Sequence, residues 1–294
     1  PASDVYIEKD SSVNERIEKL RLATTKSLLE RRDVIVVASV SCIYGLGKRK
    51  NYEDAIFRFA QGERWERRAF MLRLIENYYE RNDASLVPGT FRSRGETMEI
   101  YPAYSDTALR VSFFDDEIER IDEIDPVSGK SLLRKEKVGI FPSQHYVTST
   151  DAIQKAAGVI EREMEECCAR FTSEGKYLEA ERLRMRTKYD LEMLLEVGYC
   201  SGIENYSRYL DGREEGDPPG TLLDFFPQDA LFFIDESHMT LPQVRGMYNG
   251  DRARKEVLVE HGFRLPSCLD NRPLRWDEYE PVLKNALFIS ATPG

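Results

Sequence analysis

Two carboxylates and a histidine follow a short apolar run near the end of the chain, in the order Asp235, Glu236, Ser237, His238. An Asp at the carboxyl end of a buried strand is well placed to hold Mg²⁺ against the phosphates of a nucleotide. A neighbouring Glu can orient and deprotonate an attacking water. The motif therefore indicates nucleotide hydrolysis, with Asp235 and Glu236 as catalytic candidates and Asp235 as the metal ligand. The alternative is that these acids only end a strand and cap the next helix.

A second motif, Ser290-Ala291-Thr292, follows another apolar run. In helicase-like ATPases such a hydroxyl-bearing turn couples the nucleotide site to the nucleic-acid track. Its presence favours hydrolysis over the simple strand end and makes His238, Ser290 and Thr292 candidates for coupling the motifs.

The sequence contains no phosphate-binding loop. Such a loop needs G-x-x-x-x-G-K-[ST], because its backbone N–H groups and Lys hold phosphate and its hydroxyl holds Mg²⁺. Gly47-Lys48 has Cys42 in place of the first glycine and Arg49 in place of the hydroxyl residue. We therefore expect no bound ATP or Mg²⁺ on this chain alone, and no meaningful ATPase activity.

The elements around these motifs predict an α/β domain that other modules interrupt. A capping box at Ser12 begins a helix that is expected to reach about Arg31. The apolar segments Val34–Ala38, Ala230–Ile234 and Ala286–Ile289 are predicted to be buried strands of a parallel sheet covered by helices.

The segment from residue 52 to 147 has a different pattern, which predicts an inserted α+β domain. Amphipathic spacing predicts helices over Tyr52–Gln61 and Trp65–Tyr79. Alternation around a glycine predicts a hairpin over Thr90–Tyr101 with charged residues on its outer face, and Leu109–Phe114 with Glu117–Ile124 predicts a second strand pair.

Two long helices are predicted between Asp151 and about Val197, antiparallel because only Ser173-Glu174-Gly175 separates them. A polar loop with two prolines follows at 211–220. The expected divisions are thus 1–51 and 226–294 for the interrupted α/β domain, 52–147 for the insert and 148–225 for a helical subdomain.

Composition narrows the class of protein. A net charge of −10 over 294 residues argues against a surface built wholly for nucleic acid, although a local basic groove stays open. The five cysteines have no C-x-x-C spacing, and we expect reduced thiols in a cytoplasmic protein. The longest apolar run, near residues 34–40, is too short to cross a bilayer, so no membrane association is expected.

Longer strings carry a family resemblance. The D-E-S-H and S-A-T motifs resemble those of superfamily-two helicases. The segments 37–47 (VASVSCIYGLG), 189–210 and 241–274 resemble the UvrB family, whose members belong to the bacterial excinuclease of nucleotide excision repair. The resemblance covers essentially the whole chain.

This resemblance implies a helicase-like, RecA-like motor domain that uses ATP and Mg²⁺ in the intact protein to verify damaged DNA. It also implies an internal fragment that begins after the phosphate loop and β-hairpin and stops before the second motor domain. The implied partners are the excinuclease A subunit (UvrA), the excinuclease C subunit (UvrC) and damaged DNA.

Contact residues are expected partly from the resemblance and partly from local residue types. The insert resembles the module that docks the excinuclease A subunit, with Arg92 and Arg94 as contacts and Glu117 on the neighbouring strand; a solvated charged face is the alternative. DNA contacts are expected from hydroxyl, aromatic and basic groups, with tight turn packing or a solvated helix as the alternatives. These are Ser39, Ser41, Tyr44, Tyr206, Arg245, Tyr248, Arg252, Arg254 and Lys255. Residues 252, 254 and 255 cannot all share one helix face.

Three other interpretations remain at this stage. A transcription-repair coupling factor has related modules, but its loss of catalytic motifs disagrees with the intact D-E-S-H. The chain also fits a partner-docking module without chemistry. A DExH helicase outside repair is disfavoured by the long strings beyond the motifs.

Overall fold

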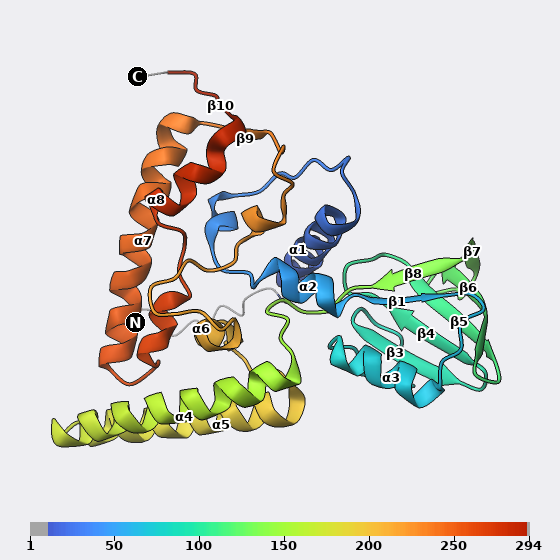
Figure 1. Cartoon of the computed structure of the whole chain (residues 1–294), viewed down its shortest axis with the longest axis horizontal. Coiled ribbons are helices and arrows are strands. Elements are labelled where there is room, and N and C mark those ends of the chain that lie inside the picture. The colour runs from blue at the N-terminus through green and yellow to red at the C-terminus, as the bar shows by residue number, and fades with distance from the viewer. Residues whose placement is uncertain (1–10, 293–294) are drawn as a thin grey trace, which may run out of the picture. The chain divides into compact units, whose positions relative to one another are not determined.

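The computed structural model describes residues 11–292, with side chains from residue 15 onward. The chain forms two compact units (Figure 1). Of the described residues, unit 1 contains 11–34 together with 52–145, and unit 2 contains 35–51 together with 146–292. Helix α2 (Arg49–Ala55) carries the chain from unit 2 into unit 1. The fold is a mixed α/β one, as predicted at that level.

Unit 1 is built on a six-stranded sheet in the order β2-β3-β4-β5-β6-β7. All neighbours are antiparallel except β2 and β3, which are parallel. A separate antiparallel pair joins β1 to β8. The elements are α1 (Ser11–Glu30), β1 (Phe57–Ala60), α3 (Arg67–Glu76), β2 (Glu80–Arg81), β3 (Thr90–Arg94), β4 (Thr97–Tyr101), β5 (Ala108–Phe114), β6 (Glu117–Ile124), β7 (Ser131–Lys135) and β8 (Lys137–Ile140).

Both predicted strand pairs of unit 1 are confirmed, and the helix ending near Arg31 is present. The Ser12 side chain lies outside the described ones, so its capping box stays a prediction. The helix predicted over Tyr52–Gln61 is wrong, because α2 ends at Ala55 and β1 follows. Phe57 and Phe59 alternate into a buried aromatic cluster with Phe70, at ring distances of 4.8 Å, and this burial outweighs helical spacing.

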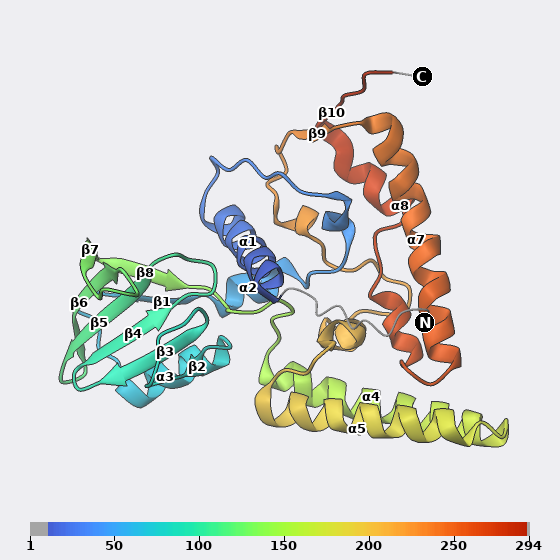
Figure 2. The ribbon, with the colours of Figure 1, turned by 180° about the vertical axis from the view of Figure 1, so that it is seen from behind.

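Unit 2 contains the predicted helix pair, α4 (Thr150–Ser173) and α5 (Tyr177–Val197), which lie side by side in both views (Figures 1 and 2). Gly175 between them has φ 77°, a conformation that favours glycine at a helix end. The other elements are η1 (Val40–Ile43), η2 (Ile203–Tyr206), α6 (Ser207–Leu210), η3 (Leu222–Phe225), β9 (Phe232–Ile234), α7 (Ser237–Glu260), η4 (Pro266–Asp270), α8 (Trp276–Tyr279), η5 (Glu280–Asn285) and β10 (Ala286–Phe288).

The predicted buried strands of unit 2 are only partly correct. β9 and β10 pair in parallel, but Phe233 and Phe288 are 59% and 50% exposed. Val34–Ala38 is not a strand at all, and Ile35 is 94% exposed. An apolar strand needs neighbours on both edges and both faces, and the described part of unit 2 holds only the β9–β10 pair. A complete RecA-like sheet therefore stays a prediction. Within residues 11–292, no helix has the length and apolar character needed to span a membrane.

Candidate functional site

The two candidate catalytic carboxylates lie at the carboxyl end of β9, and both are exposed. Asp235 Oδ1 accepts a hydrogen bond of 3.0 Å from the backbone N–H of Glu236. Glu236 is the N-cap of α7 and has φ 45°, a left-handed conformation that costs a non-glycine residue about 1–2 kcal/mol. The strand end thus presents both acids to solvent in a strained turn, a feature found often at functional sites.

The parallel pairing of β9 and β10 brings the two sequence motifs together. Ile289 donates a backbone hydrogen bond to Ile234, and Ser237 donates one to Ile289. His238 Nδ1 then lies 2.8 Å from Ser290 Oγ and 3.4 Å from Glu236 Oε2. Ser290 Oγ also accepts from the N–H of Thr292 at 3.2 Å. The proposed coupling residues therefore form one contiguous chain that reaches the carboxylate of Glu236.

The donor chemistry at this turn fits Mg²⁺ only in part. Mg²⁺ commonly uses one or two carboxylates and completes its shell with water and substrate phosphate oxygens. Asp235 and Glu236 supply such carboxylates. No group of three or more His, Cys, Asp or Glu side chains between residues 11 and 292 could hold a metal ion by itself. The turn therefore suits an ion that arrives with a phosphate ligand.

The candidate DNA contacts near the start of unit 2 lie in and beside η1, with Ser41 inside it and Ser39 and Tyr44 at its two ends. Ser39 and Ser41 are exposed, and their hydroxyl oxygens are 2.6 Å apart. Tyr44 follows η1 and packs beside a core cluster that contains Ile43 and Leu274. Burial and the nearby Asp251 raise the pKa of Tyr44.

The remaining DNA candidates divide into exposed and buried groups. Arg245, Arg252 and Arg254 are exposed on α7, and Tyr248 is half-buried. Lys255 is buried, pairs with Asp251 at 2.8 Å and donates to the backbone oxygen of Asn271. Its ammonium group is used inside the fold, so the prediction that Lys255 contacts DNA is wrong.

Tyr206 is also unsuited to the stacking role that was predicted for it. Its side chain is buried, and its hydroxyl donates to Asp190 Oδ2 at 2.8 Å. Burial, with the nearby Asp190 carboxylate, raises the pKa of Tyr206 far above its usual value. The ring is therefore a core residue of the helical part of unit 2.

The outer face of the unit 1 sheet carries a row of opposite charges on directly paired strands. The row is Arg92, Glu99, Arg110, Asp122 and Arg134. Arg92 Nε lies 2.5 Å from one Glu99 oxygen, and Arg110 donates to the other at 2.8 and 2.6 Å. Burial alone would raise the pKa of Glu99, but the hydrogen bonds from Arg110 and Arg92 outweigh it and lower that pKa.

The structure corrects the predicted position of Glu117 and leaves the partner-contact roles of Arg92 and Arg94 as predictions. Arg92 is not a free exposed arginine, because its guanidinium is used by Glu99. Arg94 is exposed and donates only to the backbone oxygen of Asp83 among the described residues, so it remains a candidate. Glu117 is not on the strand beside β3: β4 and β5 lie between them, and Glu117 forms a β-bridge with Arg64.

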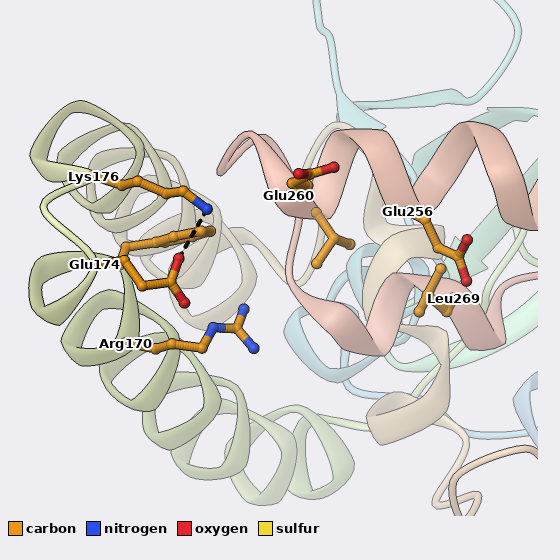
Figure 3. Close-up of a pocket in the computed structure, with 8 residues that line it drawn as sticks. Arg170, Glu174, Lys176, Glu256, Glu260 and Leu269 are labelled. Carbon is orange, nitrogen blue, oxygen red and sulfur yellow. Dashed lines mark ion pairs between the residues drawn. The ribbon is translucent and has the colours of Figure 1, made fainter.

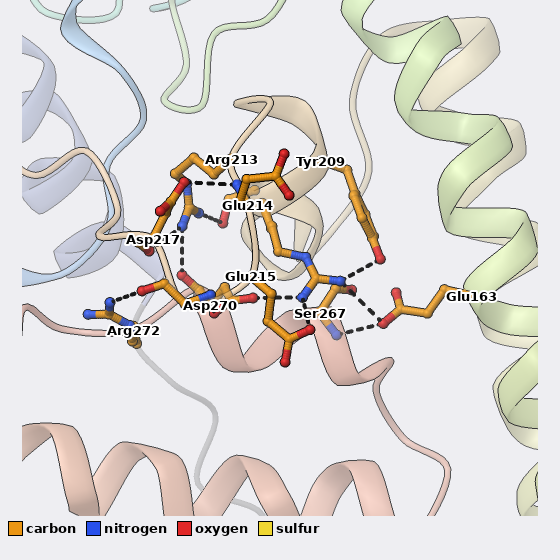
Figure 4. A network of polar contacts seen from close by, with 12 residues as sticks. Glu163, Tyr209, Arg213, Glu214, Glu215, Asp217, Ser267, Asp270 and Arg272 are labelled. Carbon is orange, nitrogen blue, oxygen red and sulfur yellow. Dashed lines mark hydrogen bonds and ion pairs between the residues drawn. The ribbon is translucent and has the colours of Figure 1, made fainter.

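A buried polar network that the sequence analysis missed joins α4, α6, the 211–220 loop and η4 (Figure 4). At its centre, Arg208 donates to Asp270 Oδ2 at 2.8 Å and lies 3.8 Å from Glu163. Arg213 donates to the backbone oxygen of Asp270 at 3.2 Å, and Arg272 donates to that of Gly216 at 2.8 Å. The charge density of the loop was visible in the sequence, but its contacts with Asp270 and Arg272 join residues more than 50 positions apart.

An open pocket of about 390 Å³ lies between the α4–α5 turn and the end of α7 (Figure 3). Arg170 and Lys176 line one side, and Glu256 and Glu260 line the other. Lys176 is paired with Glu174 at 2.8 Å. The mixed charges match no single ligand chemistry.

Comparisons with known proteins give the family. Residues 57–146 match the UvrB interaction domain, and residues 151–212 match the UvrB third helical domain. The chain is 54% identical over 294 residues to the UvrABC system protein B of Dehalococcoides mccartyi, and all of the chain is aligned. The chain belongs to the UvrB family. It is also 56% identical over 295 aligned positions to the proteins of the same name from Lactococcus lactis and Streptococcus gordonii. It spans 43 to 45% of the length of these three relatives.

Proposed function

We propose that the chain contributes to nucleotide excision repair as part of a UvrABC component, and that unit 1 docks the excinuclease A subunit (UvrA). The match of residues 57–146 to the UvrB interaction domain carries this proposal. The outer sheet face supports it. Arg94, Arg120 and Arg134 are exposed there, while the carboxylates of Glu99 and Asp122 are almost covered. A rigid arginine-bearing face suits a partner surface that is rich in carboxylates.

A titration with the excinuclease A subunit tests this proposal. Arg94→Ala should weaken binding by about 1–2 kcal/mol, or roughly 5- to 30-fold, if the arginine pairs across the interface. Arg162→Ala is the matched control, because it removes an exposed arginine from α4, outside the interaction domain. Absence of binding by the unaltered chain, or equal losses in the two variants, would refute docking through this face.

We propose further that Asp235 and Glu236 act on ATP only in a longer protein that supplies a phosphate-binding loop. There, Asp235 would hold Mg²⁺, and the ion would neutralise phosphate charge. Glu236 would accept the proton of the attacking water, and His238 with Ser290 would connect that carboxylate to β10. The excinuclease C subunit (UvrC) and damaged DNA belong to the same proposed assembly. Magnesium- and DNA-dependent ATP turnover by this chain alone would contradict the proposal that a longer protein is needed for ATP hydrolysis.

A further inference from the structure

One face of α7 carries three of the candidate DNA contacts in a row. Arg245, Tyr248 and Arg252 are spaced i, i+3 and i+7, so they line the same side of the helix over about 10 Å. Arg275, which directly precedes α8, joins them from another part of the chain. We call these four residues the arginine face. The sequence analysis did not identify Arg275.

Two guanidinium groups of this face converge on one neutral oxygen. Tyr248 Oη accepts a hydrogen bond from Arg252 at 3.2 Å and another from Arg275 at 3.2 Å. A phenol brings no negative charge to offset the repulsion between the two cations. Because the oxygen accepts twice, its own proton is free to point toward a third group. An anion placed beside Tyr248 would interact with both guanidinium groups and accept a hydrogen bond from the hydroxyl.

The charge of the arginine face is only partly neutralised by the protein. Glu256 pairs with Arg252 at 2.7 Å. Within residues 11–292, neither Arg245 nor Arg275 forms an ion pair. The nearby Glu278 is used by the buried Arg272, through two contacts of 2.7 Å, and by the backbone N–H of Arg275. Burial would raise the pKa of Tyr248, but the hydrogen bonds from Arg252 and Arg275 lower it overall, as expected in a positive environment.

Aromatic rings hold the arginines in place. The guanidinium carbon of Arg245 lies 4.2 Å from the centre of the Trp276 ring, and that of Arg275 lies 4.9 Å from the centre of the Tyr248 ring. Stacking of this kind limits side-chain motion and leaves the edge N–H groups available. The face is therefore partly preorganised for oxygen anions.

We infer that the arginine face binds the phosphodiester backbone of a nucleic-acid strand. Two guanidiniums meet on one hydroxyl, and Arg245 lies about two turns from Arg252 along α7, an arrangement that suits a chain of phosphates better than one isolated anion. The contact would position the strand without reading its bases, because all the donors are of the phosphate-binding kind. This inference rests on the proposed function in one respect, namely that the chain acts in DNA repair. It excludes Arg254, which lies on the opposite side of α7, about 180° from Arg245.

The test measures binding of the 294-residue chain to a fluorescein-labelled oligonucleotide, single-stranded or duplex, by anisotropy between 50 and 200 mM salt. Removing Arg252 and Arg275 together, as the Gln variants, should reduce the salt slope by about 1.4 for single strands, at about 0.7 per phosphate contact. We expect at least a tenfold loss of affinity at the lowest salt. Tyr248→Phe should give a smaller loss, because it removes only the hydroxyl.

Arg254→Gln is the control on the same helix; it removes one positive charge, where the double variant removes two, and should leave the slope unchanged. An unchanged slope in the double variant, an equal effect of Arg254→Gln, or no salt-dependent binding by the unaltered chain would overturn the inference. A parallel titration with the excinuclease A subunit separates the two proposals. Its failure with the unaltered chain counts against the proposed docking, whereas normal docking with an unchanged DNA slope counts against the arginine face alone.

Discussion

Glu99 should contribute strongly to the stability of unit 1. Its carboxylate is buried and accepts three hydrogen-bond contacts from Arg92 and Arg110, whose side chains are 20% and 31% exposed. Breaking a buried pair on one side costs about 3–5 kcal/mol, because the other charges lose their partner. Partial exposure lets both arginines rehydrate. We therefore expect Glu99→Gln to lower the free energy of unfolding of unit 1 by about 2–3 kcal/mol.

The chain offers a direct assay, because its two tryptophans fall in different units, Trp65 in unit 1 and Trp276 in unit 2. In a Trp276→Phe background, Trp65 fluorescence reports urea unfolding of unit 1 alone. With an m-value of about 1–3 kcal/mol per M, the midpoint should fall by about 0.7–3 M. Glu96→Gln in the same hairpin is the control, because Glu96 is exposed and its side chain has no described partner.

The pH dependence has a definite sign. The folded pKa of Glu99 is lowered, so its stabilisation is fully present above the unfolded pKa of about 4.3 and is lost as the pH falls through the folded pKa. The stability gap between the unaltered chain and Glu99→Gln should therefore be constant at neutral pH and shrink in acid. A gap below about 0.5 kcal/mol at pH 7, or one equal to that of Glu96→Gln, would refute the central role of this carboxylate.

Two further predictions concern unit 2. Gly262→Ala should destabilise unit 2 by about 2–4 kcal/mol, because φ is +68° and an added Cβ would lie 2.5 Å from the Glu179 backbone oxygen. Gly250→Ala is the control. Gly250 lies within α7 with open space around it, so this substitution should stabilise unit 2 by about 0.5–1 kcal/mol. Trp276 fluorescence in a Trp65→Phe background measures both, and similar effects would contradict the steric argument. Burial raises the pKa of the Cys42 thiol to about 11, so at pH 8 only about one thiol in a thousand is ionised and labelling should be slow until urea is added. Rapid labelling of the native chain would show that the thiol is accessible and ionised.

Local patterns predicted local structure well. The hairpin over Thr90–Tyr101 follows from alternation and a glycine turn, and the α4–α5 pair follows from helical spacing and a short connection. The failures needed distant partners. β1 has only four residues, and its strand pairing depends on β8, which lies about 80 residues further along the chain. Val34–Ala38 shows the reverse case, since its apolar composition predicted a strand, but the described structure pairs no strand with it.

Side-chain roles were harder to predict than elements. The sequence gives a local indication of the Lys255 ion pair, because Asp251 stands four residues before it on the same helix. No local pattern indicates its second partner, the backbone oxygen of Asn271. Arg275 reaches Tyr248 from 27 residues away, and no spacing rule points to that contact. The motif pair at His238 and Ser290 could be anticipated only because strand ends meet at one edge of a parallel sheet.

The arginine clusters on the unit 1 sheet and on α7 differ in what accepts their hydrogen bonds, and this difference separates structural from binding roles. On the sheet, Glu99 holds Arg92 and Arg110 with a full negative charge, so these groups stabilise the fold and have little charge left for a ligand. On α7, a neutral phenol oxygen takes that place, and the charge of Arg275 is not cancelled within the described structure. The protein has a net charge of −10, but the guanidinium of Arg275 forms no ion pair within the described structure. It can therefore attract a polyanion at short range. Salt should therefore weaken ligand binding at α7 steeply while changing the stability of the sheet much less, because the buried Glu99 contacts are poorly screened.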